Sequence, residues 1–239
     1  MNILNDINTF GFSKVKIISI DEQSIILGFI QNIFNNNLIS IGNTSQSVFD
    51  PLDSVTHDKI SNKNLRFLNA EQIDIIKNMN FFKILKNELD KKNISTKAIG
   101  GVFNENETDE EIYFRVVRPF YLSDVGVPHA DAWYHDSYNP SEKLKNALSS
   151  SFKIWIPIFP DIRYAGLSIL QNSNDSFKNY KKIFKGSGFV PSIDSSNDIK
   201  LDQVFTDSGE LLIFHPYTIH CGVVNYDTKC RISVEITLI

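Results

Sequence analysis

A histidine and an aspartate two positions apart, His129 and Asp131, form the one His-x-Asp motif of the sequence. On an extended strand, residues two apart project to the same side, so this imidazole and this carboxylate could reach one metal ion. A distant histidine would complete a face of two histidines and one carboxylate, which leaves positions open on iron for substrates and oxygen. His220 is the candidate for that ligand. The tripeptide alone is a weak signal, because it also occurs at solvated strand ends.

The other histidines have weaker claims. His135 and Asp136 lie outside the strand pairing of the motif, and we expect them in a loop over the site, with a ligand role for His135 as the alternative. His215 precedes Pro216, and we expect it to have a structural role. His57 lies in a polar, irregular segment and is expected to have no chemical role.

An arginine and a serine, Arg231 and Ser233, follow His220 after eleven residues, at the end of a run that begins at Gly209-Glu210-Leu211-Leu212. With the His-x-Asp motif, this arrangement resembles the phytanoyl-CoA-hydroxylase-like branch of the iron(II)- and 2-oxoglutarate-dependent oxygenases. In that family a His-x-Asp, a distal histidine and an Arg-x-Ser lie on a double-stranded β-helix.

The resemblance extends over most of the chain. Tyr113 to Pro119 is similar to the strand that leads to the first ligand motif, and Phe10-Gly11-Phe12 is similar to the family's N-terminal region. Gly166 to Leu170 matches a strand that normally runs into Pro-Gly-Ser-His. Here Gln171 to Asn174 replaces that ending, which changes a turn and no ligand.

The resemblance implies a set of site residues. Iron(II) would be held by His129, Asp131 and His220. The free carboxylate of 2-oxoglutarate would be held by Arg231, whose planar fork suits a carboxylate, with Ser233 as an added donor. Trp155 falls where the family keeps an aromatic residue beside oxoglutarate, Lys153 is a second candidate anchor, and O2 would be the co-substrate.

The implied activity is hydroxylation of a small polar metabolite, or of a natural-product or carbohydrate intermediate, with release of succinate and CO2. Related halogenases leave the carboxylate position empty for chloride, so Asp131 favours hydroxylation, or else desaturation, ring closure or epimerisation. One alternative is a cupin-like protein that binds a metal or a sugar without turnover, and another is a metal-dependent isomerase or hydrolase. The cupin-like alternative would leave Arg231 and Ser233 without a purpose.

The substrate pocket is expected to contain a cation and an aromatic wall. Arg115 and Arg118 project to opposite faces of one strand, so only one of them can point inward. We expect Arg118 to do so, because it adjoins Pro119 near the cavity mouth. Trp133 and Tyr134 would line the pocket beside the ligands, although ordinary core packing would also explain them.

The elements that must position these residues change type along the chain. Apolar spacing predicts a helix from an N-cap at Asp21 to about Asn35 and another from Ala70 to Leu89, with a polar loop from Ile39 to Asn64 between them. From about Ile112, short strands of period two follow. The last strand is expected to have an apolar and a polar face, with Ile232, Val234, Ile236 and Leu238 on the first and Arg231, Ser233, Glu235 and Thr237 on the second. We expect an α+β, mainly β fold: a double-stranded β-helix, or jelly-roll, with N-terminal helices outside. One domain over 1–239 would have a helical part of about 1–100 and a β-helix core of about 101–239.

The composition excludes several kinds of partner. The net charge of −4 is spread along the chain without a basic block, which argues against nucleic acid. No apolar stretch is long enough to cross a membrane, and Met1 to Phe10 lacks the features of a signal peptide. We therefore expect a cytoplasmic protein with a small-molecule substrate. The oligomeric state is left open.

Overall fold

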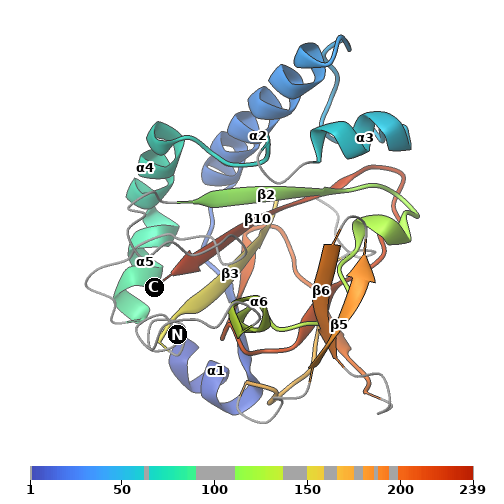
Figure 1. Ribbon diagram of the computed structural model, residues 1–239. Helices are drawn as coiled ribbons and strands as arrows, with labels where there is room; N and C mark the ends of the chain where they lie inside the picture. Colours follow the sequence, from blue (N-terminus) through green and yellow to red (C-terminus); the bar gives the residue numbers. More distant parts are fainter. Residues whose placement is uncertain are drawn as a thin grey trace.

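The structure is a computed structural model, in which residues 2–61, 65–89, 111–136, 150–158, 166–174, 180–185, 188–193 and 199–238 are described. Helices and antiparallel strands are both present, and the helices gather mainly at one side of the strands (Figure 1). None of the helices within these ranges is long and apolar enough to cross a membrane.

A five-stranded antiparallel sheet with the order β1-β8-β3-β10-β2 is the largest sheet of the described chain. Its strands are β1 (Phe12–Lys16), β8 (Glu210–Phe214), β3 (Phe152–Pro157), β10 (Arg231–Leu238) and β2 (Ile112–Val117). β10 pairs with β3 on one side and with β2 on the other. In this register Ser233 faces both Arg115 and Pro157, which fixes the side chains of three strands relative to one another.

A smaller three-stranded sheet, β7-β4-β9, packs against the first. It is built from β7 (Asp202–Val204), β4 (Leu167–Ile169) and β9 (His220–Gly222). Trp155 and Phe214 from the large sheet meet Leu167 and Ile169 in one buried apolar cluster, so the two sheets lie face to face. A separate hairpin joins β5 (Tyr180–Lys185) to β6 (Gly188–Ile193).

The helices cover the other face of the large sheet. They are α1 (Ile3–Phe10), α2 (Ile20–Ser40), α3 (Ser54–Ile60), α4 (Ala70–Asn78) and α5 (Asn80–Glu88), and a short α6 (Ala132–Asp136) follows the 3-10 turn η2 (Leu122–Asp124). Ile30 of α2 and Leu85 of α5 share the main apolar core with Ile154 and Val234 of the sheet. One face of the sheet is therefore packed by helices, and the other is turned toward the small sheet.

Strict alternation along β10 separates these two faces. Ile232, Val234, Ile236 and Leu238 belong to the core under the helices. Arg231, Ser233, Glu235 and Thr237 are also buried but project to the opposite side, as residues of odd parity must. The predicted polar face of this strand is therefore confirmed, and it is enclosed instead of wet.

The helices differ in detail from those expected. α2 begins after Ser19, which forms a capping box with Glu22, so the N-cap is Ser19 and not Asp21, and the helix continues to Ser40. The single helix expected over 70–89 breaks at Met79, whose backbone is extended. There the side chain of Glu22 accepts a hydrogen bond from the backbone of Phe81 at 3.2 Å, which caps the start of α5 from another helix. Within the polar segment, Asp53 caps the unexpected helix α3.

Candidate metal centre

Two histidines far apart in sequence are paired directly through their backbones. His129 and His220 form an isolated antiparallel bridge, in which each backbone N–H donates to the other residue's carbonyl, at 3.0 and 2.8 Å. Residues opposite each other on neighbouring strands bring their side chains together. The two imidazole rings accordingly lie with their centroids 4.7 Å apart.

Asp131 completes the group from the turn that leads into α6. Its Oδ1 lies 3.5 Å from Nε2 of His129 and 3.9 Å from Nε2 of His220. The ligand atoms of all three residues lie within 4.8 Å of one another. The shared side expected for His129 and Asp131 is therefore confirmed. The extended segment is shorter than expected, because the chain already turns at Asp131 toward the helix.

Hydrogen bonds to backbone carbonyls fix the tautomer of both histidines. Nδ1 of His129 donates to the carbonyl of Val127 at 2.6 Å, and Nδ1 of His220 donates to that of Thr218 at 3.0 Å. In each ring the lone pair is then on Nε2, the atom that faces Asp131. Burial lowers the pKa of His220 to about 4, so this ring is neutral and free to coordinate a cation at neutral pH.

A buried lysine accompanies the carboxylate. Nζ of Lys153 on β3 lies 3.5 Å from Oδ2 of Asp131, and the side chain is 1% exposed. Burial alone would raise the pKa of Asp131, but the charge of the Lys153 ammonium holds it below its usual range. Asp131 is therefore ionised, with one oxygen toward Lys153 and the other toward the histidines.

Glu235 carries a second buried carboxylate of the cavity. It accepts a hydrogen bond from Nε of Arg115 at 3.0 Å and one from the Tyr113 hydroxyl, and it lies 3.4 Å from Nζ of Lys153. These partners outweigh burial and hold the pKa of Glu235 at about 2. Glu235 is a site residue that the motifs did not predict, although the period of two places it on the same face as Arg231.

Arg231 lies in the same enclosed space without an acidic partner among the described residues. Its Nη1 donates to the carbonyls of Gly166, at 2.7 Å, and Val223, at 3.3 Å, while its buried Nε has no partner. Burial and the charge of Arg115 lower the pKa of Arg231 to about 10, which still leaves it protonated at neutral pH. The hydroxyl of Ser233 is likewise buried without a partner. A buried cation beside an unpaired hydroxyl donor fits an anion.

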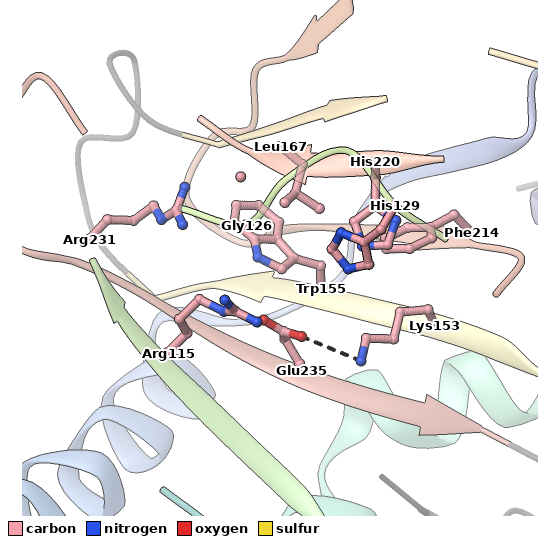
Figure 2. A pocket seen from close by; sticks show the side chains of 11 residues that line it. Arg115, Gly126, His129, Lys153, Trp155, Leu167, Phe214, His220, Arg231 and Glu235 are labelled. Atoms are coloured by element: carbon pink, nitrogen blue, oxygen red, sulfur yellow. Dashed lines mark hydrogen bonds and ion pairs between the residues drawn. The ribbon is translucent and has the colours of Figure 1, made fainter. Parts of the chain in front are cut away.

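A cavity joins most of these groups, although Asp131 and Ser233 are not among the residues that line it. Figure 2 shows Arg231 well separated from His129 and His220, with Trp155 between them, and Glu235 between Arg115 and Lys153. Trp155 and Lys153, the two further candidates for the oxoglutarate site, both line the cavity. The full lining is Arg115, Gly126, His129, Lys153, Trp155, Leu167, Phe214, His220, Gly222, Arg231 and Glu235.

Arg118 does not line the cavity, which corrects the expected choice between the two arginines. Its guanidinium forms a two-pronged ion pair with Asp124, at 2.9 and 2.7 Å, and donates to Ser54 at 3.1 Å. His57 joins the same buried pair, with its Nε2 3.4 Å from Asp124. Arg118 thus ties α3 to the loop after β2, and Arg115 is the arginine of this strand that faces inward.

Trp133 and Tyr134, the two aromatic residues after the His-x-Asp motif, lie in different surroundings. Trp133 is buried and stacks on Tyr180 of the hairpin, with ring centroids 5.1 Å apart, so it packs in the core beside the site and does not line the cavity. Tyr134 lies edge-on against His129 at 5.5 Å. His215 stacks on Tyr217, which agrees with the structural role expected for it. The side chain of His135 lies outside the described residues.

Comparison with known proteins gives structural likeness without sequence likeness. No family model matches the chain, and no curated protein matches it. The structure of EvdO2 from Micromonospora carbonacea var. aurantiaca, complexed with 2-oxoglutarate, is similar with a TM-score of 0.61 and 10% identity, over 98% of this chain and 88% of that one. EctD from S. alaskensis, with 2-oxoglutarate and 5-hydroxyectoine, gives 0.58 and 9%, over 98% and 73%.

A third similar structure is the nickel complex of ThoJ, described as a non-heme monooxygenase. Its TM-score is 0.57 at 12% identity, over 98% of this chain and 76% of that one. At such identities the likeness concerns the fold. The chain has the fold of non-heme, 2-oxoglutarate-dependent oxygenases, and its three metal-ligating candidates are assembled within that fold.

Proposed function

We propose that the protein is an iron(II)- and 2-oxoglutarate-dependent oxygenase that hydroxylates a small molecule. One observation carries the proposal: a buried arginine, with no acidic partner among the described residues, shares a cavity with His129 and His220, beside an ionised aspartate. Two histidines and one carboxylate suit iron(II) with open positions. A metal-binding protein without turnover would have no use for the buried cation of Arg231.

The assigned roles follow from the geometry. His129, Asp131 and His220 would hold the iron, and Arg231 with Ser233 would bind the far carboxylate of oxoglutarate. Iron and oxoglutarate, once bound, would let O2 act as the oxidant, with one oxygen atom used to convert oxoglutarate to succinate and CO2 and the other transferred to a C–H bond of the substrate. The chain contributes orientation, because the histidine tautomers and the aspartate are fixed by hydrogen bonds and charge before any ligand arrives. Trp155, Leu167 and Phe214 exclude water from the space between the two sheets.

The finer assignment is hydroxylation of a small polar metabolite or of a natural-product or carbohydrate intermediate. Asp131 supports this outcome, since it fills the position that a halogenase would leave for chloride. The similar proteins include one crystallised with 5-hydroxyectoine and a carbocyclase from nogalamycin biosynthesis, which makes a small-molecule substrate reasonable here. Membership of the phytanoyl-CoA-hydroxylase-like branch stays a prediction.

The test is succinate release from oxoglutarate, with iron(II), ascorbate and oxygen, across a panel of small polar molecules and acyl thioesters. We expect slow release without a substrate and faster release with a member of the polar set. Arg231→Ala should abolish both at low oxoglutarate. Undetectable oxoglutarate binding by the iron-loaded wild type would rule out the proposed function.

A further inference from the structure

We propose that Arg115 is a second carboxylate-binding residue of the cavity, distinct from Arg231, and that it binds an anionic group of the primary substrate. This inference rests on the proposed function, since it takes iron and oxoglutarate to be bound first. It names the class of substrate: a small molecule that carries a carboxylate or a similar anion.

The balance of charge gives the first reason. Iron(II), the Asp131 carboxylate, the oxoglutarate dianion and the Arg231 guanidinium are together neutral. Among the described residues that line the cavity, the ionic side chains left over are Arg115, Lys153 and Glu235, which carry one net positive charge. An uncompensated charge in an enclosed, poorly hydrated space is unfavourable. A substrate with one negative charge would neutralise the loaded site.

The exposure of the three cationic side chains indicates which of them can contact the negative charge of the substrate. Lys153 and Arg231 are each 1% exposed, and Lys153 already lies against both Asp131 and Glu235. The Arg115 side chain is 34% exposed although it lines the same cavity. Of the three cavity cations, Arg115 is therefore the one that a molecule arriving after oxoglutarate can still reach.

The chemistry of Arg115 suits a carboxylate. Its Nε is used by Glu235 at 3.0 Å, and the Tyr113 side chain is a second hydrogen-bond partner, so the guanidinium is held in a fixed orientation. Its remaining N–H donors have no other partner among the described residues and can meet a ligand. Arg115 also lies within a paired strand, opposite Ser233, so its backbone is fixed. A planar, pre-oriented guanidinium binds a carboxylate through two parallel hydrogen bonds at a small entropic cost.

The experiment measures anion preference by calorimetry on protein loaded with manganese(II) and saturated with oxoglutarate. The probes are acetate, cyclohexanecarboxylate and benzoate, each compared with its primary amide, which has nearly the same shape and no charge. For the wild type we expect at least one acid to bind about tenfold more tightly than its amide. Arg115→Gln should bring that ratio close to one, and Arg115→Lys should restore part of it.

Arg66→Gln is the matched control. Arg66 donates to the carbonyl of Phe114 on the same strand and lies within electrostatic range of Arg115, but it does not line the cavity. Removal of its charge should leave the preference for the acid in place. If Arg66→Gln and Arg115→Gln reduced the preference equally, the effect would come from overall charge and not from a binding contact.

Titration with oxoglutarate tests whether Arg115 binds the carboxylate of the primary substrate or that of the co-substrate. Arg115→Gln should keep the oxoglutarate Kd within about threefold of wild type, whereas Arg231→Ala should raise it far more. An equal loss in both variants would assign Arg115 to the co-substrate and overturn the proposal, as would equal binding of every acid and amide by the wild type. Failure of the proposed function is visible separately, as absent oxoglutarate binding in the wild type. If the wild type binds no oxoglutarate, the probes are titrated against protein loaded with manganese alone. The preference for an acid over its amide must then still depend on Arg115.

Discussion

Replacement of Arg231 by alanine removes the buried cation that faces the cavity. In the wild type this guanidinium is 1% exposed and has no acidic partner among the described residues, so a bound carboxylate would gain charge-assisted hydrogen bonds in a poorly hydrated space. Their loss costs roughly 2 to 4 kcal/mol. The oxoglutarate Kd should therefore rise by a factor of about 30 to 1,000.

The same substitution also affects stability, and the two effects can be separated. Arg231→Ala removes the donor of the Val223 carbonyl and one of two donors of the Gly166 carbonyl, which keeps the backbone N–H of Val223. This loss costs roughly 1 to 3 kcal/mol of unfolding free energy. Arg118 is equally buried but is paired with Asp124 outside the cavity. Arg118→Ala should destabilise the fold by roughly 3 to 5 kcal/mol, because the buried Asp124 carboxylate loses its guanidinium partner, and should leave oxoglutarate affinity unchanged.

The assay combines calorimetric titration of oxoglutarate into manganese-loaded protein with urea unfolding of the same samples. The expected pattern is opposite for the two variants, with affinity lost mainly in Arg231→Ala and stability lost mainly in Arg118→Ala. Wild-type oxoglutarate affinity in Arg231→Ala would refute the assignment of this residue as the anchor. Lys153, which lines the same cavity, would then be the next candidate.

Three further outcomes follow from the site. Asp131→Ala should lower bound iron below one per subunit and abolish turnover, and unchanged iron content and activity would remove the metal assignment. Lys153→Met should weaken metal binding by about 10- to 100-fold, since the ammonium that orients Asp131 is lost; a metal titration with an unaltered Kd would contradict this role. Glu235 has a pKa of about 2, depressed from 4.5, so the stability that it contributes is present above pH 4.5 and is lost as the pH falls toward 2, up to roughly 3 kcal/mol. Urea unfolding at pH 6 and pH 3 should show a smaller loss for Glu235→Gln, and equal losses would count against the buried ion pairs.

The sequence was most informative where one strand carries two faces. The period of two over 231–238 predicted both the apolar core face and the polar face with Arg231 and Ser233, because alternation is a local property of extended chain. It also placed His129 and Asp131 on one side. The direct bridge between His129 and His220 was not predictable, because strand register depends on contacts between distant segments.

The choice between Arg115 and Arg118 shows a different limit. The expectation that only one of them points inward was sound, but β2 ends at Val117, so Arg118 lies beyond the paired strand and is captured by Asp124. A local sequence pattern does not show whether an arginine just after a strand will form an ion pair with a turn residue or point into the cavity. Trp133 has the same explanation, since its partner Tyr180 comes from a hairpin elsewhere in the chain.

The bridge between His129 and His220 has a consequence for the choice of ion. Because main-chain hydrogen bonds set the spacing of the two imidazoles, the backbone and not the ion brings these two ligands together. A preformed site of nitrogen and oxygen donors follows the usual affinity order of divalent ions, in which iron ranks below cobalt, nickel and copper. Iron occupancy of this chain would then depend on the supply of metals in the cell, and protein purified from another medium would carry whichever competing ion that medium provides.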